Sequence, residues 1–271
     1  MAKEFVFTRD DFKEIQKVVA ASSGINLGDH KFEMVYGRIA RRLRATGLRT
    51  VKDYLSLIEN NNLENIQFIN AITTNLTYFF RENHHFEFLR KTVIPELVSK
   101  HTNDKRVRIW SAGCSTGEEP YSIALTLDEF LRKYATWDTK ILATDLDTQV
   151  LEKARVGLYN DERVQSLSGD VKKNLFEMTK NGFRVKDRHR KTIFFKQLNL
   201  MHSWPMKGKF DVIFCRNVLI YFERSVQQAL IDKFRQVLQP KGLLILGHSE
   251  SIGAQAQHFE PLGKTIFRRK V

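Results

Sequence analysis

Two glycines followed by two acids form the segment of this sequence that is best suited to bind a small molecule. Gly113 and Gly117 lie between an apolar run and an amphipathic one, and Glu118 and Glu119 come directly after them. A glycine-rich turn between a strand and a helix lets the backbone approach a nucleotide, although two glycines also occur in ordinary tight turns. The two carboxylates would repel a pyrophosphate and attract an ammonium group, and their alternative role is to stabilise the helix dipole.

The ligand class that suits these acids is a nucleoside with an amino-acid tail, and S-adenosylmethionine carries such an ammonium group. We expect one of Glu118 and Glu119 to bind it, with the choice between them open. Asp145 ends a second apolar run, where a carboxylate can accept hydrogen bonds from both ribose hydroxyls; its alternative role is to cap the next helix. Asn199 follows a third expected strand and could reach an edge of adenine. The order of these residues favours a methyl donor over a dinucleotide.

Other kinds of reactive centre find little support in the sequence. Cys114 lies inside the glycine turn without a neighbouring base, so a small buried residue is the better interpretation. His84 and His85 lack the spacing of a metal-binding helix, and we expect no metal site. The only two cysteines, Cys114 and Cys215, make no disulfide framework, as is usual in a reducing cytoplasm.

Short apolar runs alternate with amphipathic segments over the second part of the chain. This alternation predicts an α/β domain with a mainly parallel, doubly wound sheet. The expected strands are 107–110, 140–144, 210–215 and 242–246, and a helix should follow each of the first three. Between Gly157 and Asn199 the alternation stops. Asn181-Gly182 is a hairpin signal in this interval, which predicts a small antiparallel insert.

Residues 1 to about 90 have helical spacing, and one of the expected helices is strongly basic. Segment 31–52 holds seven Lys/Arg and a single acid, Glu33. Its apolar residues fall on one helical stripe, so four arginines should project from the other side: Arg38, Arg41, Arg42 and Arg44. The whole chain carries 44 basic and 31 acidic residues, a formal charge of +13. This surplus favours an acidic partner, whether nucleic acid, anionic lipid or protein. No apolar run has membrane-spanning length, so no membrane insertion is expected.

Three longer stretches, with a fourth near the C-terminus, match a single family. They are Asn75-Leu76-Thr77-Tyr78-Phe79-Phe80-Arg81, the segment from Trp110 to Ser122, the segment from Phe214 to Phe222, and Gly247-His248-Ser249-Glu250. With these motifs the sequence resembles the CheR family of chemotaxis receptor methyltransferases over essentially its whole length. We therefore expect a small all-α domain over 1–85, a linker over 86–105 and a Rossmann-like class I methyltransferase domain over 106–271. The β insert of that domain should cover about 172–196.

The resemblance also implies a reaction and assigns residues to it. In this family a methyl group passes from S-adenosylmethionine to glutamates on the cytoplasmic methylation helices of chemoreceptors, giving S-adenosylhomocysteine and a glutamyl methyl ester. Arg81 and Tyr221 would face the reacting methyl group, and Arg216 or Arg81 would hold the substrate carboxylate. The expected cofactor contacts are Asn75, Thr77, Arg81, Gly113, Glu118 or Glu119, Asp145, Asn199, Leu200, Arg216 and Asn217.

The implied reaction needs no general base, because a glutamate with a pKa of about 4.3 is already anionic at neutral pH. The enzyme only has to align the carboxylate with the methyl carbon and sulfur. The basic helix 31–52 would dock on the acid-rich receptor helices, although each arginine could be no more than a solvated surface residue. Some family members grip a receptor pentapeptide through a longer glycine-rich loop of the insert. The short hairpin at 177–183 predicts that this tether is absent, and we expect a cytoplasmic monomer at receptor arrays.

Two other functions stay open from the sequence alone. A nucleic-acid methyltransferase would suit the positive charge, but Arg216-Asn217-Val218-Leu219 stands where such enzymes carry an Asp/Asn-Pro-Pro-Tyr motif. The segment also offers no clear aromatic platform for a flipped base, so no nucleic-acid partner is expected. A silent adaptor that binds the cofactor without turnover is the second alternative, and the presence of Arg81, Arg216 and Tyr221 argues against it.

Overall fold

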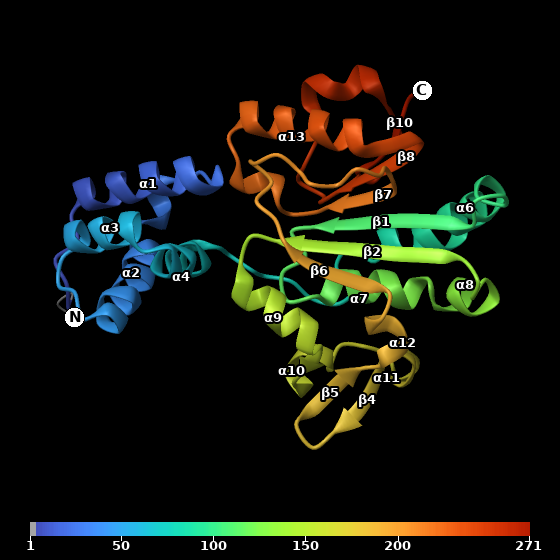
Figure 1. Cartoon of the computed structure of the whole chain (residues 1–271), viewed down its shortest axis with the longest axis horizontal. Coiled ribbons are helices and arrows are strands. Elements are labelled where there is room, and N and C mark those ends of the chain that lie inside the picture. Colours follow the sequence, from blue (N-terminus) through green and yellow to red (C-terminus); the bar gives the residue numbers. More distant parts are fainter. Residues whose placement is uncertain (1–3) are drawn as a thin grey trace.

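The computed structural model describes residues 4–271 as a helical domain joined by an extended segment to a larger α/β domain (Figure 1). The helical domain contains α1 (Arg9–Ser23), α2 (Phe32–Thr46), α3 (Val51–Asn60) and α4 (Asn62–Ile72). Local signals set these limits. Thr8 and Asp11 form a capping box at the start of α1, and Gly24 ends this helix in the left-handed conformation. Side chains of Thr50 and Asn61 cap α3 and α4 in the same way.

The apolar stripe predicted for the basic helix is confirmed in α2. Val35, Ile39 and Leu43 are at most 1% exposed and pack against α1, α3 and α4. This domain also buries an ion pair: the Arg42 guanidinium donates two hydrogen bonds to Glu64, at 2.9 and 2.7 Å. The Tyr54 hydroxyl donates a third to the same carboxylate, at 2.8 Å. The core of the helical domain is therefore apolar with one satisfied polar cluster.

The predicted doubly wound sheet is confirmed. Seven strands lie in the order β6-β2-β1-β7-β8-β10-β9, and the first five of that order are parallel. Their bounds are β1 (Arg106–Ala112), β2 (Asp138–Asp145), β6 (Ile193–Gln197), β7 (Phe210–Cys215), β8 (Leu238–Leu246), β9 (Phe259–Pro261) and β10 (Ile266–Arg269). The helices beside the sheet include α7 (Glu118–Thr126), α8 (Asp128–Lys133), α9 (Thr148–Val156) and α13 (Arg224–Val237) (Figure 1). The chain leaves β1 toward β2 on one side and reaches β7 on the other, so a ligand crevice is expected at the carboxyl end of β1.

The predicted hairpin is confirmed, but the expected limits of the insert are wrong. Strands β4 (Phe176–Thr179) and β5 (Gly182–Val185) pair antiparallel around Asn181. A third strand, β3 (Leu158–Tyr159), joins the other side of β5, so the insert begins well before 172. It also contains α10 (Asp161–Val164), α11 (Gly169–Leu175) and α12 (Asp187–Arg190). At the other end, β6 belongs to the main sheet, where it pairs parallel with β2.

The expected linker over 86–105 is also wrong. This range is mostly helical, with α5 (His84–Phe88), a π-helical turn η2 (Leu89–Val93) and α6 (Ile94–Lys100). Phe86, Leu89, Val93 and Leu97 are buried in the core of the α/β domain. Pro95 does not break α6, because it lies in the first turn, where no helical N–H is needed. The two domains are connected instead through the extended residues 73–78.

Candidate active site

A cavity that is open to solvent lies between the helical domain and the carboxyl ends of β1, β2 and β7. The helical domain contributes Ser23, Ile25 and Lys31, and the extended segment 73–78 forms another part of the wall. Every residue expected to contact the cofactor lines this cavity except Glu118: Asn75, Thr77, Arg81, Gly113, Glu119, Asp145, Asn199, Leu200, Arg216 and Asn217. Tyr221 lines it as well. The cavity therefore brings together residues from six separated stretches of the sequence.

The glycine turn after β1 requires its glycines. Gly113 has a φ of +81°, and a Cβ atom on it would lie 2.3 Å from the Val218 Cγ2 atom. Gly117 has a φ of +98° and starts α7. The N–H groups of Gly113 and Cys114 both donate to the Thr144 carbonyl of β2, at 2.8 and 2.9 Å. Cys114 is buried, and burial raises the pKa of its thiol well above the usual value, so it is not a reactive nucleophile.

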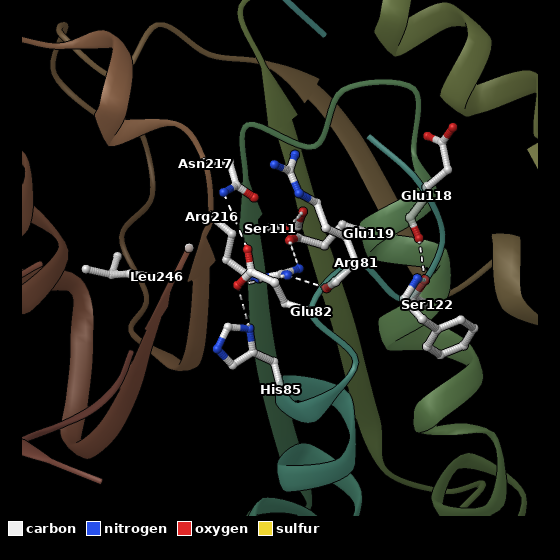
Figure 2. A network of polar contacts seen from close by, with 12 residues as sticks. Arg81, Glu82, His85, Ser111, Glu118, Glu119, Ser122, Arg216, Asn217 and Leu246 are labelled. Atoms are coloured by element: carbon white, nitrogen blue, oxygen red, sulfur yellow. Dashed lines mark hydrogen bonds and ion pairs between the residues drawn. The ribbon is translucent and has the colours of Figure 1, made fainter. Parts of the chain in front are cut away.

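The two acids after the turn point to different places (Figure 2). Glu118 is fully buried; it accepts a hydrogen bond from the Thr116 hydroxyl at 2.6 Å and lies 3.4 Å from Arg163 of the insert. Glu119 faces the cavity and accepts from the Ser111 hydroxyl at 2.7 Å and from Arg216 at 2.9 Å. Burial raises the pKa of both carboxyls, and for Glu119 the neighbouring Arg216 opposes that rise. Of the two, only Glu119 is placed to meet a ligand.

Asp145 lines the cavity and does not cap a helix. Its carboxylate accepts one hydrogen bond from the Ser115 N–H at 2.8 Å and one from the Asp147 N–H at 3.0 Å. Each oxygen therefore keeps a lone pair for a ligand hydroxyl. Burial raises the pKa of Asp145 to about 6, although these two N–H groups favour the charged form. The capping alternative is wrong, because Asp147 is the residue that caps α9.

Two of the side-chain amides that are expected to contact the cofactor also form hydrogen bonds within the protein. The Asn75 amide donates to the Asp147 carboxylate at 2.8 Å. The Asn199 amide donates to the Ser22 carbonyl at the end of α1, at 2.8 Å, and its oxygen accepts from the Met201 N–H. Each amide group keeps a second hydrogen-bonding position, so the contact with adenine stays a prediction, and Asn199 has a further role. It joins the two domains beside the cavity.

The sequence suggests that Arg216 could hold a substrate carboxylate, but in the structure its guanidinium is engaged by the protein. Its side chain is 2% exposed and donates to Glu119 and to the Arg81 carbonyl, and it lies 3.4 Å from the Glu82 carboxylate (Figure 2). Arg81 is more open: one guanidinium N–H donates to the Leu76 carbonyl at 3.0 Å, and the rest of the group faces the cavity. The Tyr221 hydroxyl contacts no hydrogen-bond partner among residues 4–271, and burial raises its pKa.

Reasoning from the sequence missed two acids at this site. Glu250 is 6% exposed and accepts hydrogen bonds from the Gly247, Asn217 and Val218 N–H groups at 2.6, 2.9 and 2.8 Å, so it fixes the loop that leads to Tyr221. The second acid, Glu82, lies 3.4 Å from Arg216. The ligand atoms of Glu82, His84 and His85 fall within 4.8 Å of one another. An ion there would compete with Arg216 for Glu82, and we propose no metal site.

Comparison with known proteins agrees with this geometry. The profile for the CheR methyltransferase all-alpha domain matches residues 10–73, and that for the CheR methyltransferase SAM binding domain matches residues 75–268. The chain belongs to the CheR methyltransferase family. It is 42% identical to a probable chemotaxis protein methyltransferase of Rhizobium etli, over 93% of this chain and 96% of that one. Chemotaxis protein methyltransferase 2 of Pseudomonas aeruginosa is 39% identical (98% and 95%), and the Escherichia coli chemotaxis protein methyltransferase is 40% identical (98% and 93%).

This CheR-family chain is thus an S-adenosylmethionine-dependent methyltransferase, and its cavity fits that cofactor. Glu119 offers a carboxylate to an ammonium group, and Asp145 offers free lone pairs to hydroxyls. No helix within residues 4–271 is long and apolar enough to cross a membrane.

The basic helix of the CheR-family chain is divided in its contacts, contrary to the expectation of one solvent face. Arg38 is half-buried and donates to the Ile72 and Thr73 carbonyls at the end of α4. Arg42 is held by the buried Glu64. Arg41 and Arg44 are exposed, and Arg44 lies 3.2 Å from Glu4. Only these two arginines are placed for contact with another molecule.

Proposed function

We propose that this CheR-family enzyme methylates glutamate side chains on the cytoplasmic helices of bacterial chemoreceptors, where it acts as a monomer at receptor arrays during adaptation. The observation that carries the proposal is the pair Arg81 and Tyr221 at one cavity. A cationic fork and an unpartnered hydroxyl there suit a carboxylate acceptor. The names of the related chemotaxis protein methyltransferases support a role in chemotaxis.

When bound, S-adenosylmethionine supplies an electrophilic methyl group on a sulfonium sulfur. Glu119 would hold its ammonium group and Asp145 its ribose, while the glycine turn lies beneath. Arg81 and Tyr221 would orient the glutamate carboxylate toward the methyl carbon. Such alignment is enough, because the glutamate is already ionised at neutral pH.

The docking surface that we propose is the exposed part of α2, formed by Arg41 and Arg44. Two exposed cations on one helix would complement an acid-rich receptor helix and speed its capture. Arg38 and Arg42, which the sequence placed on the same surface, hold the helical domain together instead.

We also propose that no receptor pentapeptide tethers this enzyme. The β4–β5 hairpin turns through only Lys180 and Asn181, so it lacks a longer loop for gripping a peptide. Calorimetry with a receptor C-terminal pentapeptide should show no heat of binding. Micromolar affinity would contradict this part of the proposal.

Transfer of a labelled methyl group from S-adenosylmethionine to receptor-containing membranes tests the main proposal. We expect label on the receptor that mild base releases, since methyl esters hydrolyse easily. Membranes without receptors and duplex DNA serve as matched acceptors, because the nucleic-acid alternative predicts label on DNA. Cofactor binding without label on any acceptor would support the silent adaptor and overturn the proposal.

A further inference from the structure

The turn before α5 has an unusual backbone. Phe80 and Glu82 both have a φ of +55°, the left-handed region, which non-glycine residues rarely adopt. The Phe80 N–H donates to the Ser122 hydroxyl of α7 at 3.0 Å, which helps to hold this conformation. Strained residues of this kind concentrate at functional sites.

The turn delivers two acceptors to the Arg216 guanidinium. The Arg81 carbonyl accepts from Arg216, and the Glu82 carboxylate lies 3.4 Å from it (Figure 2). Arg81 lies between the two left-handed residues, and its side chain faces the cavity. The Glu82 side chain faces Arg216 instead. The other Glu82 oxygen contacts His248 Nδ1 at 3.1 Å and Asn217 Nδ2 at 3.4 Å. Glu82 itself does not line the cavity.

The charges around Arg216 do not cancel. One guanidinium lies between two carboxylates, Glu119 at 2.9 Å and Glu82 at 3.4 Å. Burial alone would raise the pKa of Glu82, but Arg216 and His248 lower it to about 2, so Glu82 is ionised at neutral pH. His85, on the far side of Glu82, adds no positive charge, because burial and the nearby Arg216 lower its pKa to about 4. With both carboxylates ionised, the group formed by Arg216, Glu82 and Glu119 carries one excess negative charge.

We propose that Glu82 is a positioning residue that supplies this excess charge: by sharing Arg216 it leaves Glu119 available for the ammonium group of the cofactor. Without Glu82, Arg216 would neutralise Glu119, and the site would lose its attraction for a cation. Glu82 would thus make the site selective for nucleosides that carry an amino-acid tail. The inference rests on the proposed role of Glu119 at the cofactor's methionine end.

Glu82→Gln tests the idea, because it removes the charge and keeps the shape. Binding of two ligands is measured by calorimetry: S-adenosylhomocysteine, which has the ammonium group, and 5′-methylthioadenosine, which lacks the amino-acid part. The variant should bind S-adenosylhomocysteine on the order of 10- to 50-fold more weakly, the effect of one lost charge at partly screened distance. Its affinity for 5′-methylthioadenosine should stay within about twofold of wild type.

Two further variants complete the test. Glu82→Asp keeps the charge and should recover most of the affinity for S-adenosylhomocysteine. Glu87→Gln is the control, since Glu87 is paired with Arg90 and Lys91 on the next turn of helix, away from the cavity. Equal weakening of both ligands by Glu82→Gln, or no weakening of either, would overturn the proposal. No receptor is present in this experiment, so its outcome is independent of whether receptor glutamates are the methyl acceptors.

Discussion

The buried charge of Asp145 lowers the stability of the fold, and the same charge would serve to bind a ligand. Its pKa of about 6 lies above the value of about 3.9 for a free aspartate, mainly because it is buried. The ionised form is therefore disfavoured in the fold. Asp145 lowers stability progressively as the pH rises from about 4 to about 6, and by a constant amount above that range. Ribose hydroxyls need the ionised carboxylate as an acceptor, so the same charge that destabilises the fold would serve the ligand.

The expected pH dependence follows from this carboxylate. Affinity for S-adenosylhomocysteine should be constant from pH 8 to about 7 and fall as the pH drops through about 6, because protonation removes an acceptor. Asp145→Asn should bind about 10- to 100-fold more weakly at pH 8 and show a flatter profile. A profile equally steep in Asp145→Asn would assign the titration to another group, such as Glu119.

Tyr221 gives a second prediction at the scale of the residue. Its hydroxyl contacts no partner among residues 4–271, so Tyr221→Phe should leave the melting temperature unchanged. If the hydroxyl orients the acceptor carboxylate, the rate of methyl transfer should fall about 10- to 100-fold. Affinity for S-adenosylhomocysteine should change less than about twofold. A large loss of that affinity would place the hydroxyl against the cofactor instead.

At the scale of elements, α2 contains two neighbouring arginines with different functions. Arg42 shares the buried Glu64 with Tyr54, whereas Arg41 is exposed. Arg42→Ala would leave a buried carboxylate without its cation and should lower the free energy of unfolding by on the order of 3 kcal/mol. Arg41→Ala should change it by less than about 0.5 kcal/mol and should slow receptor methylation through weaker docking. Chemical denaturation and the methylation assay measure the two effects; a reversed pattern would exclude α2 as the docking element.

The same helix shows why the sequence predicts some features and not others. Hydrophobic spacing identifies the buried stripe of α2, because burial is periodic along one element. The partner of Arg42 lies 22 residues away, a contact that periodicity does not report. The strand β3 has only two residues, too few for any pattern. The segment 86–105 has the sequence pattern of a linker, because Pro95 and a polar run interrupt its apolar spacing. Its helices are nevertheless packed into the core of the α/β domain.

The active-site residues divide in the same way. The order of the glycine turn and Asp145 was predictable, because a doubly wound sheet fixes which ends of its strands meet. The choice of Glu119 over Glu118 depends on the rotation of α7 about its axis. The hydrogen bond from Asn199 to the Ser22 carbonyl depends on how α1 docks on the α/β domain. Sequence spacing does not report Glu82 and Glu250, because most of their contacts are with residues 30 or more positions away.

At the scale of the whole molecule, the cavity belongs to both domains. Ile25 forms an isolated β-bridge with Phe222, Asn26 bonds Glu223, and Asn199 bonds the Ser22 carbonyl. A ligand in the cavity would touch both sides and hold them together. The connecting segment carries exposed residues: Leu76 is 73% exposed and Tyr78 is 52% exposed. Exchange of the cofactor is therefore expected to depend on movement at residues 73–78.

Limited proteolysis measures that movement. Chymotrypsin should cleave the full chain after Leu76 or Tyr78, and saturating S-adenosylhomocysteine should slow this cleavage about tenfold or more, because binding favours the closed arrangement. Asn199→Ala removes one contact between the domains and should speed cleavage without ligand. Equal cleavage rates with and without ligand would show that the domains do not separate on cofactor exchange.

The methyl acceptor that we propose is a glutamate carboxylate of a chemoreceptor. Mass spectrometry of receptor peptides after incubation with the enzyme and S-adenosylmethionine can identify it. We predict a single added methyl group on particular glutamates that is lost after mild base, and it should form about 10- to 100-fold more slowly when Tyr221→Phe replaces the wild-type enzyme. A base-stable methyl group on lysine, or no modified glutamate with active enzyme and bound cofactor, would contradict the claim.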